Sequence, residues 1–474
     1  MQVIGAAVLA MVLVLCAALV YAGTRSARSW FPRQWDPQIA PIAQEVATLR
    51  GLQYTHPVEV RYLEPRDFEK MLDDSGGTDA ASRADAQRED AVFRALGFIG
   101  GSTDLMAETQ TSETSGTLAF YDPTSQKIYI RGTTLDVEHR VTIAHELTHV
   151  LQDQNFGLVK LQMRAMKSNT GDLSTLKGLV EGDAVRIQEE YLQQLSPAER
   201  SEYAREDDAE HARVGQETSN VPPIVPVLLG APYEFGPATV RVLVASGGES
   251  AINDALTGPA PSSALFVAAG DVKAGVPVDP PAPPDGGVAT GRPELFGPFE
   301  MFLAMATRID PTRALESADA VDGGIATTFE RDGVTCYSVR VHPASDSAKE
   351  FLSDAVLDWS AGRPDTTVDH SGADVGFTAC DPGRTAPVLG DAGLHAAVQL
   401  LEVRIALTDE IAKAHDDGDF ARCVARTFVY EPGAAALVLA IGNNEPTPEQ
   451  TAHLRALSAA GAADCRDNPG AGLP

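Results

Sequence analysis

Residues 142–154 read TIAHELTHVLQDQ, and this stretch decides how the rest of the chain is interpreted. Apolar side chains recur within it and just before it at the spacing of an α-helix. We therefore predict a helix from about residue 137 to residue 154, with one side buried in a core. The apolar positions that support this prediction are Val141, Ile143, Ala144, Leu147, Val150 and Leu151.

The segment from His145 to His149 forms a complete H-E-x-x-H motif. Residues four apart lie on one face of a helix, so His145 and His149 can direct both imidazoles at one Zn²⁺ ion. Glu146 is placed to act as the general base that takes a proton from a water on that ion. With ten histidines in 474 residues, a chance match has a probability of about one per cent. The alternative is a solvated helix face, but a half-buried helix needs partners for two histidines and a glutamate.

A catalytic zinc site usually has three protein ligands and one open position, so a third ligand must come from elsewhere in the chain. Glu181, in the segment LVEGDA at 179–184, is the best candidate. It lies within a second helix expected over residues 173–195. Its small neighbours Gly182 and Ala184 would let this helix approach the first one closely. The alternative is an ordinary exposed helix glutamate.

Two aspartates give further alternatives for the metal site. Asp183 could be the ligand instead of Glu181, or it could accept a hydrogen bond from a histidine N–H. Asp153 lies four residues after His149 and could orient that histidine, although a solvated helix residue is the more common role. No third histidine follows at the spacing H-x-x-G-x-x-H, which excludes metzincin chemistry.

Stabilisation of a developing oxyanion needs a hydrogen-bond donor close to it. Tyr233, in the segment PYEFG at 232–236, and His211 are the candidates, with Tyr191 behind them. Buried tyrosines are mostly structural, so the competing interpretation of Tyr233 is a core residue. The predicted catalytic residues are therefore Glu146 and Tyr233.

The chain is strongly acidic, with 66 Asp and Glu against 37 Lys and Arg and a net charge of −29. No basic cluster interrupts this excess, which argues against nucleic acids and anionic lipid surfaces as partners. A length of 474 residues and a hydrophobic content of 44% allow two or three domains with ordinary cores.

Residues 3–22 form an unbroken apolar run of about the length that spans a bilayer. We expect residues 1–23 to be a membrane anchor, with a cleaved signal sequence as the alternative. Arginines follow the run and no basic residue precedes it, which by the positive-inside rule would leave the protein in the cytoplasm. The cysteines argue for an extracytoplasmic protein instead, because their even number after the run fits two disulfides in an oxidising compartment. These cysteines are Cys336, Cys380, Cys423 and Cys465.

The chain as a whole is expected to be α+β and predominantly helical. A strand is predicted at 56–64, and strands at 116–123 and 127–132 form a hairpin because Asp-Pro-Thr-Ser between them is turn chemistry. An exposed edge of this hairpin beside the zinc would bind an extended peptide by main-chain pairing, and the alternative is a plain structural sheet. Further along, residues 295–318 are expected to be helical and residues 336–342 to form a strand.

Four segments occur in an order that resembles a known family, namely LAFYDPTSQKIYIRG (118–132), TIAHELTHVLQDQNF (142–156), GLVEGDA (178–184) and PYEFG (232–236). Over roughly residues 36–345 the chain resembles membrane-anchored zinc-metallopeptidase-like proteins of actinobacteria and related bacteria, which belong to the gluzincin-like group. The resemblance implies a zincin-like fold with a small sheet. It also implies that His145, His149 and Glu181 are zinc ligands and that Glu146 is the general base.

The chain departs from the family at 318–325, ADAVDGGI, where an aromatic-Gly-Gly-Asp segment is expected and the aromatic residue and the Asp are missing. We expect a zinc-metallopeptidase-like domain over 24–375 and a small disulfide-containing C-terminal region over 376–474. The predicted function is hydrolysis of a peptide or protein substrate at the cell surface, by a zinc-bound water that Glu146 activates. The alternatives are a non-catalytic cell-surface binding or scaffold protein that retains the metal site, and a zinc hydrolase of cell-wall amides.

Overall fold

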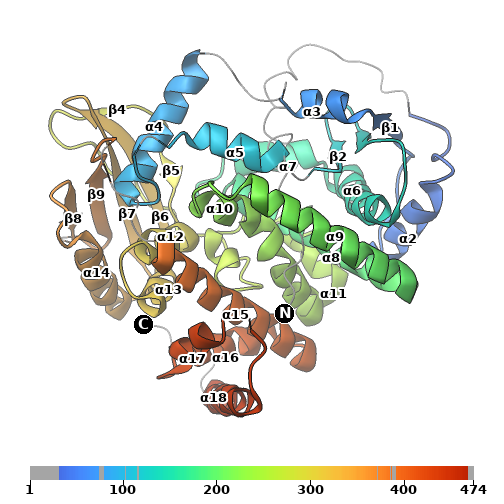
Figure 1. Cartoon of the computed structure of the whole chain (residues 1–474). Helices are drawn as coiled ribbons and strands as arrows, with labels where there is room; N and C mark the ends of the chain where they lie inside the picture. The colour runs from blue at the N-terminus through green and yellow to red at the C-terminus, as the bar shows by residue number, and fades with distance from the viewer. Residues whose placement is uncertain are drawn as a thin grey trace.

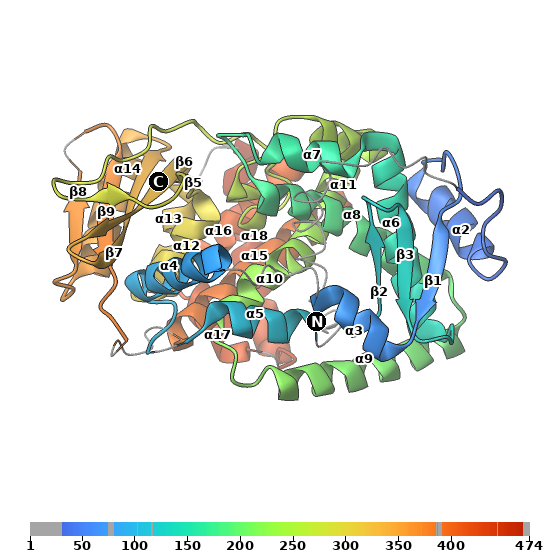
Figure 2. The ribbon, with the colours of Figure 1, turned by 90° about the horizontal axis from the view of Figure 1, so that it is seen from above.

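The computed structural model describes residues 31–73, 80–101, 103–114, 117–370, 372–384, 386, 391–442 and 444–467. Within these residues the protein is α+β and mostly helical, which confirms the fold class at this level. Two small sheets lie towards opposite ends of the molecule, with long helices between them (Figure 1, Figure 2). The helices between the sheets carry the residues that the sequence singled out.

The smaller sheet confirms the predicted strand and the predicted hairpin. Its order is β1-β3-β2, with β1 (Glu59–Leu63) parallel to β3 (Lys127–Arg131) and β2 (Ala119–Asp122) antiparallel to β3. The side chain of Asp122 holds the hairpin turn, since it accepts a hydrogen bond from the amide of Thr124 at 2.8 Å. In this order β2 is an edge strand, and it lies beside the helix that carries the H-E-x-x-H motif.

Helix α6 (Val137–Phe156) carries the motif and begins where the sequence predicted. Its N-cap is Asp136, whose side chain accepts a hydrogen bond from the amide of His139 at 3.0 Å, and Gly157 in the left-handed conformation ends it. The apolar positions of the motif segment are fully buried in a core shared with α2 (Ala40–Arg50) and the smaller sheet. The motif's polar side chains are buried as well. The helix therefore lies inside the protein, whereas the sequence predicted only one buried side.

Helix α8 (Leu173–Gln194) occupies the range predicted for the second helix and packs against α6. The role of Gly182 differs from the prediction that it allows α8 to approach α6. A Cβ on Gly182 would lie 2.4 Å from the carbonyl carbon of Gly236, the first residue of α11 (Gly236–Thr257). The glycine therefore permits the close approach of α11 to α8.

The larger sheet is antiparallel, with the order β4-β6-β7-β9-β8 and with β5 paired to β6. The strand predicted at 336–342 is confirmed as part of β7. The predicted helical stretch 295–318 contains α12 (Pro298–Ala306) and most of α13 (Pro311–Asp319). The strands are β4 (Val288–Ala289), β5 (Glu294–Leu295), β6 (Val321–Arg331), β7 (Val334–Pro343), β8 (Thr366–Asp369) and β9 (Val375–Cys380).

The remaining helices fill the space between and around the two sheets (Figure 2). They are α3 (Pro65–Asp73), α4 (Ala80–Leu96), α5 (Leu105–Thr114), α7 (Leu158–Ala165), α9 (Pro197–Glu217), α10 (Ile224–Glu234), the short 3₁₀ helix η2 (Ser263–Phe266), α14 (Asp346–Ser360), α15 (Asp391–His415), α16 (Gly418–Tyr430), α17 (Ala434–Ile441) and α18 (Pro448–Asp467).

The C-terminal region packs onto the rest of the protein through a common core. Leu400 of α15 belongs to the same buried cluster as residues of α11, α13 and the larger sheet. The disulfide Cys336–Cys380 crosses the boundary that we expected between residues 375 and 376, and the disulfide Cys423–Cys465 joins α16 to α18. These bonds confirm the two disulfides predicted from the number of cysteines.

Among the described residues, none of the helices by itself combines the length and the hydropathy that a bilayer span needs. Helices α16 and α17 together have the required length and composition, but they meet at a bend of 86°. The anchor expected over residues 1–23 lies outside the described residues.

Candidate metal centre

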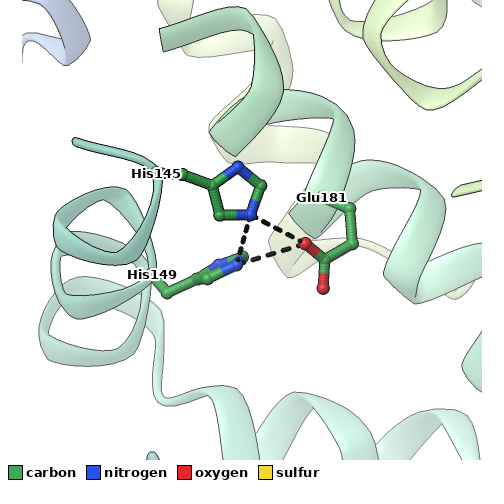
Figure 3. A group of neighbouring side chains, drawn as sticks. All are labelled: His145, His149 and Glu181. Atoms are coloured by element: carbon green, nitrogen blue, oxygen red, sulfur yellow. Dashed lines mark hydrogen bonds and ion pairs between the residues drawn. The ribbon is translucent and has the colours of Figure 1, made fainter. Parts of the chain in front are cut away.

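Side chains of α6 and α8 converge at one point inside the protein (Figure 3). The Nε2 atoms of His145 and His149 lie 3.1 Å apart, and they lie 3.2 and 3.1 Å from Oε2 of Glu181. Ligand atoms of the three residues therefore all lie within 4.8 Å of one another. The structure thus brings together the three residues that the sequence predicted as metal ligands.

The helical spacing of the motif explains this convergence. His145 and His149 occupy successive turns of one face of α6, so their rings are neighbours, with centroids 4.7 Å apart and planes at 84°. Glu181 faces them from the middle of α8 (Figure 3). The group is therefore held by two long packed helices rather than by loops.

Two glutamines determine which ring nitrogens carry a proton. Oε1 of Gln188 lies 3.0 Å from Nδ1 of His145, and Oε1 of Gln152 lies 2.9 Å from Nδ1 of His149. An amide oxygen only accepts hydrogen bonds, so each Nδ1 must be the donor. In a neutral imidazole the other nitrogen then has no proton. When both imidazoles are neutral, both Nε2 atoms consequently present lone pairs towards Glu181.

With neutral imidazoles, three acceptor atoms would face one another in a buried place. His145, His149 and Glu181 are only 3%, 5% and 0% exposed, and Oε1 of Glu181 has no hydrogen-bond partner among the described residues. Buried acceptors without a donor are costly, so the group needs a positive charge at its centre. Two imidazole nitrogens and a carboxylate oxygen are ligands that divalent first-row metals take. This group could hold a metal ion.

The pKa values of the three residues also reflect the need for a positive charge at the centre of the group. Burial lowers the pKa of His145. Burial alone would raise the pKa of Glu181, but the two imidazoles hold it well below its usual range. Burial alone would lower the pKa of His149, but the carboxylates of Glu181 and Glu146 raise it to about 9. In the metal-free protein the positive charge is thus a proton on His149, with which a metal ion would compete.

Glu146 lies beside the group and is 0% exposed. Its Oε2 accepts a hydrogen bond from the backbone N–H of Tyr121 on β2 at 2.7 Å, whereas its Oε1 has no partner among the described residues. Burial raises the pKa of this carboxyl to about 8. A carboxyl held by one oxygen, with a pKa near neutrality, can both accept and release a proton.

The two aspartates considered from the sequence have other partners. Asp183 accepts hydrogen bonds from Arg50 at 2.7 Å and from Gln152 at 3.1 Å. Gln152 therefore lies between Asp183 and His149, and Asp183 does not accept from a histidine directly as we predicted. Asp153 accepts a hydrogen bond from the hydroxyl of Tyr121 at 2.8 Å and does not orient the motif histidine, whose Nδ1 donates to Gln152.

The candidates for oxyanion stabilisation lie on three different helices. Tyr233 is buried on α10, which packs against α8, and Tyr191 is buried on α8 itself. His211 lies on α9, with its Nδ1 2.7 Å from the backbone oxygen of Asp207. The oxyanion role of Tyr233 stays a prediction.

The two glutamines were not predicted, although each follows a ligand at helical spacing. Gln152 lies three residues after His149, and Gln188 lies seven residues after Glu181, so each shares a helix face with a ligand. The backbone amide that holds the Glu146 carboxyl has no signal in the sequence, because every residue except proline carries such a group.

Comparisons with protein-family models, with curated proteins and with solved structures found no match to this chain. Its class is therefore defined by its own fold and site, as an α+β, mostly helical protein with a buried His-His-Glu group that could hold a metal ion. The resemblance of HELTHVLQDQ and VEGDA to zinc-metallopeptidase-like proteins stays a prediction from the sequence.

Proposed function

We propose that this protein is a zinc-dependent metallopeptidase of the gluzincin-like group, with His145, His149 and Glu181 as the zinc ligands. The observation that carries the proposal is the convergence of two imidazole Nε2 atoms on one carboxylate oxygen at 3.1 and 3.2 Å, with the Glu146 carboxyl beside them. Zinc in catalytic sites takes three protein ligands of this kind and leaves a position open.

The side chains of this chain would divide the work of peptide hydrolysis among them. Zinc would supply Lewis acidity, which makes a water molecule more acidic and polarises a carbonyl group. Glu146 would take the proton of the attacking water on Oε1, the oxygen without a partner, and pass it to the leaving amine. The backbone N–H of Tyr121 steadies the other carboxyl oxygen during this transfer. Tyr233 is the proposed hydrogen-bond donor to the oxyanion.

The surroundings of the site support a peptide substrate and a zincin-like fold. The motif helix α6 packs beside the edge strand β2, and the third ligand comes from a separate helix later in the chain. The contact between Tyr121 and Glu146 places main-chain groups of β2 next to the metal group. Ala119, Phe120 and Tyr121 of β2 are buried rather than exposed, so an extended peptide could add to this edge by main-chain hydrogen bonding only after the elements that cover it open.

The proposed location is the outer surface of a cell membrane, with the N-terminal apolar segment as the anchor. Two disulfides support this location, because such bonds persist in oxidising compartments and are rare in the cytosol. The strongly negative charge of the chain fits a protein that acts on peptides rather than on nucleic acids.

The proposed function is tested by Glu146→Gln in the full chain, purified in detergent. Glutamine keeps the size of the side chain and can still accept the Tyr121 N–H, but it cannot take a proton. We expect zinc to remain bound while cleavage of a peptide library falls by about 10²–10⁴-fold, the usual contribution of a general base. Glu138→Gln on the same helix is the matched control and should cleave like the wild type. Equal cleavage by Glu146→Gln and the wild type would show that the mechanism is wrong.

The burial of the site favours a second candidate, a non-catalytic cell-surface binding or scaffold protein that keeps the metal. In this conformation His145, Glu146, His149 and Glu181 are each at most 5% exposed. The same peptide library distinguishes the two functions. Zinc bound stoichiometrically by the wild type, without cleavage of any peptide, would favour the binding protein over the peptidase.

A further inference from the structure

We propose that Gln152 and Gln188 are positioning residues of the metal centre, and that they are held in place by different means. Buried charges orient the amide of Gln152, whereas the amide of Gln188 meets a hydroxyl group that can turn. This inference rests on the metal centre of the proposed function but not on peptide hydrolysis. It predicts that the same change, from glutamine to glutamate, has different effects at the two positions.

The orientation of the Gln152 amide is fixed by two acceptors. Its Nε2 donates to the backbone oxygen of Val180 at 2.9 Å and to Oδ2 of Asp183 at 3.1 Å. Turning the amide over would place its oxygen against both of these oxygens. The side chain is 0% exposed, so water cannot compensate. Oε1 must therefore face Nδ1 of His149, which it does at 2.9 Å.

A network of buried charges holds the Asp183 carboxylate in place. Its Oδ2 accepts from Nε of Arg50 at 2.7 Å, and its Oδ1 accepts from Arg186 at 3.1 Å. Glu249 on α11 pairs with both arginines, at 2.8 and 3.0 Å, and Glu190 pairs with Arg186 at 2.9 Å, so three carboxylates surround two guanidinium groups. Arg50 and Asp183 are both 0% exposed. Helices α2, α8 and α11 thus meet in one network that fixes a single amide.

Gln188 holds His145 in different surroundings. Its Oε1 lies 3.0 Å from Nδ1 of His145, and its side chain also hydrogen-bonds to the hydroxyl group of Tyr203 on α9. A hydroxyl group can donate as well as accept, because its hydrogen rotates about the C–O bond. The Tyr203 hydroxyl group also hydrogen-bonds to Asp207, which has His211 at 3.5 Å as another partner. The hydroxyl group can therefore turn from Asp207 to an oxygen in place of the Gln188 amide nitrogen.

Each glutamine fixes the tautomer and the ring orientation of one histidine. Partners of this kind usually set the affinity of a metal site, and their loss typically costs about 10–100-fold. A carboxylate in the same place makes the imidazole a stronger ligand, provided that the carboxylate itself is tolerated. The surroundings tolerate a carboxylate at Gln188 but not at Gln152, where it would face Asp183.

The test compares four variants of the full chain in detergent, namely Gln152→Leu, Gln188→Leu, Gln152→Glu and Gln188→Glu. Zinc affinity is measured by competition with a chromophoric chelator, and the ligand field is measured from the absorption spectrum of the Co²⁺-loaded protein. Both leucine variants should bind zinc about 10–100-fold more weakly than the wild type. Gln152→Glu should weaken zinc binding similarly and change the cobalt spectrum. Gln188→Glu should bind zinc at least as tightly as the wild type, with an unchanged cobalt spectrum.

Equal zinc affinities of Gln152→Glu and Gln188→Glu would overturn the inference, and so would wild-type affinity in both leucine variants. A purely structural role would predict lower stability without a change in the cobalt spectrum. Because no readout depends on cleavage, a wild type that binds zinc but cleaves no peptide refutes the peptidase and leaves this inference intact. A wild type that binds no zinc would overturn both.

Discussion

Replacing Gly182 by alanine sets two opposite effects against each other. In an unhindered helix, alanine is favoured over glycine by about 1 kcal/mol. At this position, however, the new Cβ would lie 2.4 and 2.5 Å from the carbonyl carbon and oxygen of Gly236. Ordinary contacts begin at 3.4 Å, so α8 and α11 would have to separate by about 1 Å.

The steric effect should dominate, because the clash is with main-chain atoms that cannot rotate away. Overpacking of an interior typically costs about 1–3 kcal/mol. After the gain in helix propensity, we expect Gly182→Ala to lower the free energy of unfolding by up to about 2 kcal/mol. Because Glu181 is the preceding residue, the shift of α8 should also move its carboxylate relative to the histidines and weaken zinc binding.

The assay is urea unfolding of the full chain with a metal chelator present, followed by zinc titration of the same variants. Gly215→Ala on α9 is the matched control, since no atom lies within 4 Å of a Cβ built at that glycine. It should raise the free energy of unfolding by about 0.5–1 kcal/mol, because alanine is the better helix former. A gain in stability in Gly182→Ala like that in Gly215→Ala would refute the close-approach explanation.

Two predictions concern residues away from the metal centre. Burial, together with the negative charge of Asp172, raises the pKa of Glu300 from 4.5 to about 7. The contribution of Glu300 to the free energy of unfolding is therefore present below pH 4.5 and lost as the pH rises through about 7. Glu300→Gln keeps an acceptor for Ser263 and should raise the urea midpoint at pH 8 but not at pH 4. Equal urea midpoints of the variant and the wild type at pH 8 would contradict this. Replacing Cys423 and Cys465 by alanine removes a disulfide between positions 42 residues apart. It should lower the free energy of unfolding by about 2–4 kcal/mol and speed proteolysis of α18. An unchanged proteolysis rate would show that α18 is held by packing alone.

The motif helix and its partner helix could be predicted from the sequence because their signals are local. The spacing of His145 and His149 requires only that the segment is helical, and apolar periodicity showed that it is. The reason given for the small residue beside Glu181 was wrong, since Gly182 faces α11. Apolar periodicity reveals the apolar side of a helix only. This periodicity could not show that the polar side of α6 is buried too. On that side, glutamines and carboxylates are the partners of the histidines.

The outer parts of the site could not be predicted, because they depend on contacts between distant segments. Arg50 lies 133 residues from Asp183 in sequence, and no spacing rule connects them. The disulfide pairing was open for the same reason, since four cysteines allow three pairings. Sheet register resolves it, because Cys336 on β7 lies directly opposite Cys380 on β9.

Tyr121 connects β2 to α6 at two points, through its N–H to Glu146 and through its hydroxyl to Asp153 two turns further along the helix. Gln152 connects α6 to α8 in turn, through Val180 and Asp183. The edge strand, Glu146 and the three residues of the metal group therefore form one rigid unit whose parts cannot separate without breaking buried hydrogen bonds. A substrate of the proposed peptidase would still have to reach side chains that are almost fully covered. The opening that would admit it would have to come from elements packed around this unit, so substitutions that loosen those elements should change access without changing the geometry of the site.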